Sequence, residues 1–132
     1  MKIEKVEGVV VNERDYSESS KILDVFTNKY GVISMIAKGV KRLKNKLRAT
    51  ASKFTYGYFH IYYKKDKLST LIDIDIIDSL RNIRADLFKM GYVSFICELV
   101  GQVGRQIIKD TDNKEIFKIL TSSLLKINNN FD

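Results

Sequence analysis

The chain has 132 residues, 45% of them hydrophobic, and a formal net charge of +7, with one cysteine and no proline. This length suits one full domain, or a small domain packed on part of another, and the apolar content excludes a disordered chain. No stretch reaches the roughly 20 apolar residues that cross a bilayer, and the charged N-terminus lacks the apolar centre of a signal peptide, so we expect a cytoplasmic protein. A single Cys97 excludes an internal disulfide and, with His60 as the one histidine, argues against a zinc site within the chain.

The first 80 residues favour β-structure, because β-branched and aromatic residues are concentrated in short runs. Five strands are predicted, over residues 6–11, 21–27, 32–38, 54–63 and 68–77. In the fifth run, alternation predicts one buried face formed by Ile72, Ile74 and Ile76. The opposite, solvated face would hold Asp73 and Asp75.

Two tight turns and one long basic segment connect these strands. Residues 28–31 and 64–67 have the composition of hairpin turns, with Gly31 available for a positive φ. Residues 39–53 lack a period-2 pattern, and we expect a short helix there around Leu47, Ala49 and Ala51. Five short strands with an insertion after the third predict an OB-fold barrel, although strand count alone leaves an SH3-like barrel open.

After Ser79 the hydrophobic period becomes that of a helix. A helix of about 25 residues is predicted from the spacing of Phe88, Tyr92, Phe95, Ile96, Leu99, Val103 and Ile107. A second helix is predicted to begin at Asp112 as N-cap, with Glu115 three residues later. Such broad apolar stripes either pack on the barrel, meet a continuation of the chain or pair with another copy.

The predicted fold class is therefore mainly β followed by α. We expect residues 1–80 to form an OB-fold domain and residues 81–132 to form a truncated helical domain.

The basic charge is concentrated in one zone of the sequence. Residues 29–67 hold eleven basic residues and one acidic residue, a net charge of +10, so the remainder of a chain of net charge +7 sums to −3. Proteins bind polyanions by neutralising phosphates and releasing their counterions, which makes nucleic acid the first partner to consider. A solvated basic loop kept for solubility is the alternative.

Six cations on a loop predicted to be mobile are the strongest candidates for phosphate contacts: Lys38, Lys41, Arg42, Lys44, Lys46 and Arg48. Gly39 would let the backbone of this loop approach a phosphate closely. OB-folds bind through their second and third strands and the flanking loops. We therefore expect further cations at the rim of the same groove, namely Arg14, Lys64, Lys65 and Lys67.

Aromatic residues follow the basic loop directly. Tyr56, Tyr58 and Tyr62 are the favoured candidates for stacking on bases, because their hydroxyls tolerate a wet surface. Rings in a small barrel more often fill its core, and that reading also stays open. The predicted groove would be bordered by both basic clusters, with these tyrosines between them.

No pattern in the sequence predicts catalysis. Asp73, Asp75 and Asp78 are expected on a solvated strand face and not in a metal site, since no histidine joins them. There is no phosphate-binding glycine loop, nucleophile elbow or metal-ligand cluster. We therefore expect a non-enzymatic protein without a cofactor, a small-molecule substrate or a membrane partner.

Several short motifs together resemble one known family. They are Asp-Tyr-Ser-Glu-Ser at 15–19, Thr-Asn-Lys-Tyr-Gly at 27–31, Ala-Lys-Gly-Val-Lys-Arg at 37–42, Phe-Thr-Tyr-Gly at 54–57, and Tyr92 followed by Glu-Leu-Val at 98–100. In order and spacing they resemble the RecO family of bacterial recombination mediators, over essentially the whole chain.

The resemblance implies an N-terminal OB-fold that binds single- and double-stranded DNA, followed by a helical domain. It also implies annealing of complementary strands, contact with the acidic C-terminal tail of single-strand-binding protein, and work with RecR, and in many bacteria RecF, to load RecA at the nucleoid. In the family's basic loop, the matching positions are Lys38, Lys41 and Arg42, and the match of Lys44, Lys46 and Arg48 is looser.

The chain departs from the family pattern in two ways. Family members often carry proline in the basic loop, and this chain has none. They usually run on with further helices and often a four-cysteine zinc site, which this sequence does not contain. The competing hypothesis is a protein-interaction module whose basic zone docks an acidic tail such as that of single-strand-binding protein.

Overall fold

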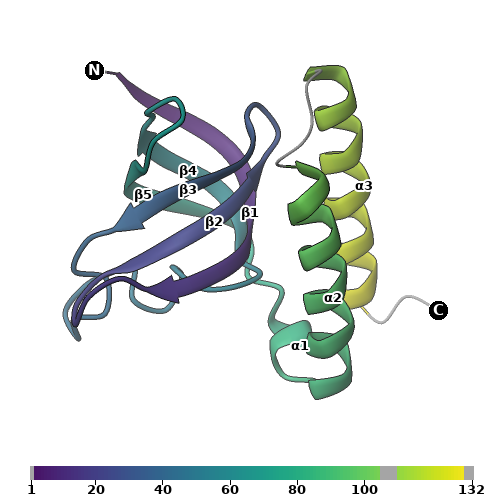
Figure 1. Cartoon of the computed structure of the whole chain (residues 1–132). Coiled ribbons are helices and arrows are strands. Elements are labelled where there is room, and N and C mark those ends of the chain that lie inside the picture. The colour runs from purple at the N-terminus through teal and green to yellow at the C-terminus, as the bar shows by residue number, and fades with distance from the viewer. Residues whose placement is uncertain (1, 105–109, 130–132) are drawn as a thin grey trace.

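The structure, a computed structural model, describes residues 2–104 and 110–129, which form a β-barrel followed by helices (Figure 1). The strands are β1 (Ile3–Asp15), β2 (Lys21–Thr27), β3 (Gly31–Ala37), β4 (Tyr56–Tyr62) and β5 (Ser69–Asp78). The helices are α1 (Arg81–Arg84), α2 (Leu87–Gly104) and α3 (Asp110–Asn128). The predicted class, mainly β followed by α, is confirmed, and all five predicted strands are present, four of them with shifted ends.

The strands close into a barrel in the order β1-β2-β3-β5-β4. Neighbouring strands are antiparallel except β3 and β5, which run parallel through two residue pairs, Met35 with Ser69 and Ile36 with Thr70. This is the OB-fold arrangement that the sequence predicted. Because β3 pairs with β5, the chain must cross one end of the barrel to reach β4.

The middle of strand β1, residues 8–11, is buried on both faces, which explains its three consecutive valines. Val6 and Val10 belong to the core inside the barrel, whereas Val9 and Val11 belong to a second core between the barrel and the helices. Alternating residues of a strand point to opposite faces, so a strand packed on both sides is apolar at every position.

Helix α3 is fixed to the rest of the molecule near each of its ends. At one end, the Asn113 side-chain amide donates hydrogen bonds to the backbone carbonyls of Thr27 and Asn28. At the other end, the side-chain Oδ1 of Asn128 accepts from the backbone N–H groups of Asn82 and Ile83 and so caps α1. In between, the Phe117 ring packs against the barrel.

The helices differ from the predicted ones in length and in orientation. Helix α2 has 18 residues instead of about 25, and Ile107 lies outside the described residues. Helix α3 begins at Asp110, so Asp112 lies within the helix and is not its N-cap. The predicted apolar stripe of α2 faces outward: Phe88 is 91% exposed and Tyr92 is 67% exposed. Helix α2 instead packs on the barrel through a different face, which includes Val93 and Cys97.

Strand β5 also departs from the predicted alternation. Ile74 is buried, as expected, but Ile72 and Ile76 are 37% and 46% exposed. The pairing of β4 with β5 shifts register between His60 and Ile61, whose partners are Asp73 and Leu71, so Ile72 is left without a partner on β4. Such a bulge re-aims the extra side chain, and a periodic pattern does not reveal it.

Candidate nucleic-acid interface

The segment between β3 and β4, residues 38–55, is a chain of turns at one end of the barrel. Successive backbone hydrogen bonds close these turns, from Arg42 N–H to Gly39, from Asn45 N–H to Arg42 and from Arg48 N–H to Asn45. No helix forms at Leu47, so the predicted short helix is wrong. We call residues 38–48 of this segment the basic loop.

Buried residues fasten the segment to the barrel. Val40 and Ala51 are buried in the inner core, and Leu47 packs against it. Gly39 adopts a φ of 67° and donates its N–H to the Ser20 Oγ at 3.0 Å. A side chain at this φ is unfavourable, which explains a glycine at this position. The loop predicted to be mobile is therefore held at defined points, and its charged side chains project from a fixed backbone.

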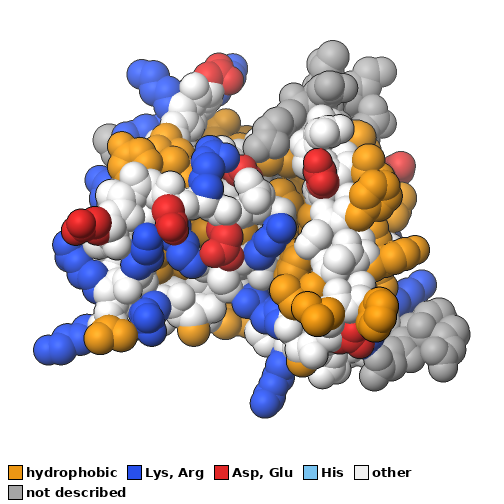
Figure 2. Space-filling view, turned by 60° about the horizontal axis from the view of Figure 1, so that its bottom comes forward, with side chains coloured by type: hydrophobic (Ala, Val, Ile, Leu, Met, Phe, Trp, Pro, Cys, Tyr) orange, Lys and Arg blue, Asp and Glu red, His pale blue; other side chains and the backbone are white. Residues whose placement is uncertain are grey.

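Three cations of the basic loop are exposed and have no ion pair with any described residue: Lys38, Arg42 and Lys44. The other three have partners. Lys41 Nζ lies 3.2 Å from Asp15 Oδ1, Lys46 Nζ lies 3.4 Å from Asp73 Oδ2, and Arg48 Nε donates to a backbone carbonyl. Figure 2 shows Lys and Arg side chains gathered over the barrel, whereas hydrophobic side chains gather on the helices.

The β1–β2 connection lies directly beside the basic loop. Lys41 donates its backbone N–H to the carbonyl of Ser19 and its Nζ to the carbonyl of Ser17. These contacts make Lys41 part of the framework that joins the two loops. OB-folds use the loop between their first two strands in binding, so this neighbourhood suits a nucleic-acid interface.

Arg14 lies on the outer face of the barrel, where it is held by Asp24. Its Nη1 is 2.9 Å from Asp24 Oδ2, and the Ser34 hydroxyl donates to Asp24 Oδ1 at 2.6 Å. The Asp24 side chain is 3% exposed, whereas that of Arg14 is 51% exposed. The Arg14 guanidinium thus pairs with a buried carboxylate, while about half of its side chain stays exposed.

An open cavity of about 410 Å³ lies where the basic loop passes β5. Its lining residues come from the end of β3, from the basic loop and from β5: Ala37, Lys38, Val40, Lys44, Asn45, Lys46, Leu47, Leu71 and Ile72. Three of the six cations predicted in the loop therefore surround one hollow. Its volume falls within the range of small-molecule sites.

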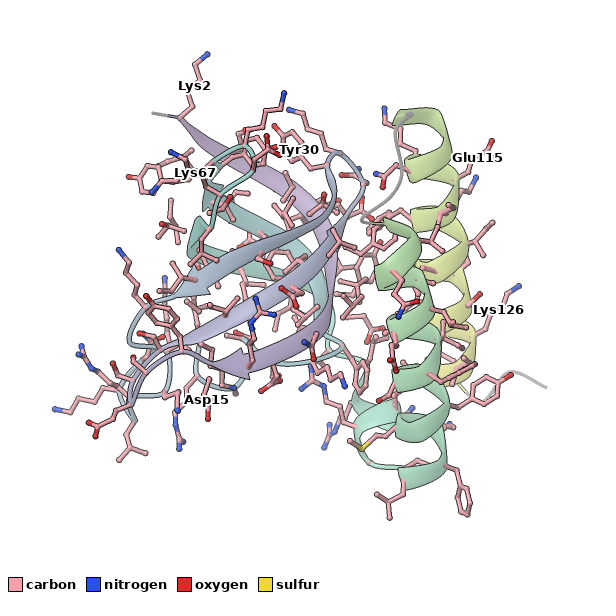
Figure 3. All side chains as sticks on the ribbon, viewed as in Figure 1. Lys2, Asp15, Tyr30, Lys67, Glu115 and Lys126 are labelled. Carbon is pink, nitrogen blue, oxygen red and sulfur yellow. The ribbon has the colours of Figure 1, made fainter. Side chains whose placement is uncertain are left out.

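The turn between β4 and β5 lies at the other end of the barrel. Figure 3 labels Lys67 at one end and Asp15, the partner of Lys41, at the opposite end. Lys64, Lys65 and Lys67 are exposed, but none of them lines the cavity. The prediction that both basic clusters border one groove is wrong. Because β3 and β5 run parallel, the loop that leaves β3 and the turn that enters β5 lie at opposite ends of the barrel.

That end of the barrel is closed by a stacked pair of rings. The Tyr30 and Tyr63 centroids are 3.9 Å apart with the ring planes within 5°. The Tyr30 hydroxyl donates to Glu4 Oε1 at 2.6 Å, and Lys29 Nζ lies 2.9 Å from the same oxygen. These hydrogen bonds, first that from Tyr30 and then that from Lys29, lower the pKa of Glu4. Lys29 therefore adds to the basic charge of residues 29–67 in the sequence, but in the structure it forms an ion pair with Glu4.

The three candidate tyrosines have different environments. Tyr56 is 9% exposed, its ring packs on Phe117 at 6.4 Å, and its hydroxyl bonds to Glu7. Burial raises the pKa of the Tyr56 hydroxyl. Tyr56 is therefore a core residue, and its burial contradicts the prediction that it stacks on bases. Tyr58 is 37% exposed, with Lys5 Nζ 4.6 Å from its ring centroid, and Tyr62 is half-buried on the same strand face.

The aspartates of β5 have separate partners. Asp73 pairs with Lys46, Asp75 Oδ2 lies 2.8 Å from His60 Nε2, and Asp78 accepts the backbone N–H of Leu80. The hydrogen bond with His60 lowers the pKa of Asp75. Among residues 2–104 and 110–129, no three His, Cys, Asp or Glu side chains are grouped as metal ligands.

Sequence reasoning missed Ile72 and Asn45 as cavity residues. Asn45 accepts the Leu47 N–H at 2.8 Å and so shapes the loop at the hollow. An asparagine between lysines in a turn-rich segment carries a weak signal for this role, since Asn often bonds to the backbone two residues later. Ile72 carried no such signal, because its exposure depends on the bulge.

A closed five-stranded barrel with an outward-facing basic loop defines the chain as an OB-fold protein whose exposed charge suits a polyanion. A comparison with known families agrees. The family model described as "Recombination protein O N terminal" matches residues 1–80, which include β1 to β5. The chain belongs to this family.

Curated relatives match nearly all of the chain. "DNA repair protein RecO" of Halalkalibacterium halodurans is 38% identical over 128 residues, which is 97% of this chain and 49% of that protein. The proteins of the same name from Listeria monocytogenes and Oceanobacillus iheyensis are 31% and 34% identical, with 98% and 96% of this chain covered and 49% and 48% of those proteins. The chain thus spans about half the length of the curated relatives it matches. Among its described residues, no helix is long and apolar enough to cross a membrane.

Proposed function

We propose that this chain binds DNA in recombinational repair and that the basic loop is its main phosphate contact. The observation that carries the proposal is the placement of three exposed cations on a fixed loop at one end of an OB-fold barrel. These cations, Lys38, Arg42 and Lys44, form no ion pair within residues 2–104 and 110–129. The curated relatives support it, since all three named above are called DNA repair proteins.

The contribution of each cation to phosphate binding depends on whether it already forms an ion pair within the protein. A phosphate that approaches Lys38, Arg42 or Lys44 competes with no carboxylate of the described residues. Counterions released from the neutralised phosphates then provide the main driving force for binding nucleic acid. A phosphate at Lys41 or Lys46 must compete with Asp15 or Asp73. We therefore assign the larger share of the electrostatic attraction to the three unpaired cations.

The proposal extends to both single- and double-stranded DNA, to annealing of complementary strands and to assisting RecA loading with RecR. Contact with the acidic tail of single-strand-binding protein belongs to the same proposal. These parts are supported by the resemblance to the RecO family and by the family match. The proposed activity is binding, in the cytoplasm at the nucleoid, and it requires neither catalysis nor a cofactor.

The test is fluorescence anisotropy with labelled single-stranded and duplex DNA across a salt series. About six phosphate contacts predict a slope of log affinity against log salt near −4 on single strands, from about 0.7 per contact. Absence of binding at low salt would overturn the proposal. Full displacement of DNA by a stoichiometric Asp-rich peptide would favour the competing function, an interaction module for acidic tails.

A further inference from the structure

The cavity beside the basic loop exists because two strands separate. Strands β3 and β5 pair only through Met35 with Ser69 and Ile36 with Thr70. Beyond these pairs β3 ends at Ala37 and the chain turns away, while β5 continues to Asp78. The hollow of about 410 Å³ occupies this fork.

The walls of the cavity divide into an apolar floor and a cationic rim. Val40 and Leu71, which are 2% and 7% exposed, lie among the apolar lining residues, together with Leu47 and Ile72. The exposed Lys38, Lys44 and Lys46 provide the cationic part of the lining. Lys46 is held on the β5 side by Asp73 at 3.4 Å.

This combination selects a particular ligand chemistry. A simple anion would satisfy the lysines but gains nothing from an apolar floor, and a hydrocarbon gains nothing from the lysines. A nucleobase with its flanking phosphates uses both, because its faces are apolar and its backbone is anionic. Proteins that take up single bases hold them between apolar or aromatic side chains in the same way.

Ile72 supplies the exposed part of the apolar wall. The bulge in β5 leaves it without a partner on β4, and its side chain is 37% exposed at the cavity. Bulges commonly redirect a side chain next to a functional site. An isoleucine exposed there has no packing role comparable to that of its buried neighbour Ile74.

We infer that this cavity takes one unstacked base of single-stranded DNA, while Lys38, Lys44 and Lys46 contact the adjoining phosphates. The inference rests on the proposed DNA binding and deepens it, since it names a subsite and a reason to prefer single strands. Bases within a duplex are paired and stacked, so they do not reach the cavity without being extruded.

The test compares a thymidine oligomer with an equally long abasic oligomer, which carries the same phosphate charge without bases. The wild-type chain should bind the thymidine oligomer about 5- to 150-fold more tightly, as expected for about 1 to 3 kcal/mol per stacked base. The Ile72→Ser variant should lower this ratio by about threefold or more, because the apolar wall is removed. Its salt slope and its affinity for a blunt duplex should not change.

Ile76→Ser is the matched control, because Ile76 is an exposed isoleucine of the same strand and does not line the cavity. It should keep the wild-type ratio. Normal salt-dependent binding with equal affinity for both oligomers, or a ratio that Ile72→Ser leaves unchanged, would overturn the base subsite while DNA binding stands. A wild-type chain that binds neither oligomer would overturn both proposals.

Discussion

Removing the three unpaired cations of the basic loop should weaken DNA binding far more than removing three cations elsewhere. The change is the triple variant Lys38→Ala, Arg42→Ala and Lys44→Ala. None of these side chains forms an ion pair or a side-chain hydrogen bond with another described residue, so their loss should leave the fold intact.

The magnitude follows from counterion release. Each single-strand phosphate contact adds about 0.7 to the salt slope, so three lost contacts should change it from about −4 to about −2. The same relation predicts a loss of about 0.7 log units of affinity per contact at 0.1 M salt relative to 1 M, or about 100-fold for three contacts. The two proteins should converge in affinity as salt approaches 1 M.

The charge-matched control is Lys64→Ala, Lys65→Ala and Lys67→Ala, at the other end of the barrel. Both triple variants remove three positive charges, so a nonspecific effect of net charge would weaken both equally. We expect the turn variant to change the slope by less than one contact, about 0.7. Anisotropy across a salt series measures both slopes. A turn variant as weak as the loop variant would refute our assignment of the interface.

Three further predictions concern stability and reactivity. Phe117→Ala should lower the free energy of unfolding by about 3 to 5 kcal/mol in urea titrations, because this ring is 4% exposed and packs on Phe26 at 5.9 Å; a loss below about 1 kcal/mol would show that the helices do not depend on this contact. The folded-state pKa of Glu4 lies below its ordinary value of 4.5, so its stabilisation is present above that pH and is lost as pH falls through the lowered pKa. Glu4→Gln should therefore reduce the acid sensitivity of unfolding, and identical pH profiles for both proteins would contradict this. Burial raises the pKa of the Cys97 thiol to about 11, so Ellman's reagent at pH 8 should label it only in denaturant; rapid labelling of the native chain would show that α2 opens.

The strands could be predicted because their residues follow simple rules. Residues 21–27 were placed correctly to the residue, and the turn at Gly31 has the expected positive φ of 69°. Both depend on local composition alone. The OB-fold barrel was predicted from the number of strands and the position of the long insertion. These are properties of the whole chain, so errors at individual strand ends do not affect them.

The errors arose where a contact between distant segments decides the outcome. The exposure of Ile72 depends on a register shift against β4, and the burial of Tyr56 depends on α3 covering that strand. The engagement of Lys41 depends on Asp15. Periodicity indicates which residues share a face of a strand or helix, but it does not indicate which distant residues contact that face. It therefore could not distinguish the cations that form ion pairs from those that do not.

The barrel topology explains why the basic residues between β3 and β4 lie at one end of the barrel. In a simple meander β3 would be followed by its neighbour through a short turn, and cations there would lie at a hairpin tip. Here the neighbour of β3 is β5, so residues 38–55 must cross the end of the barrel to reach β4. This crossing brings the lysines beside the open fork between β3 and β5. In the sequence, the run of basic residues indicates only that the ligand is a polyanion. In the fold, an apolar cavity lies next to these residues, and this combination favours single-stranded nucleic acid over a polyanion without bases.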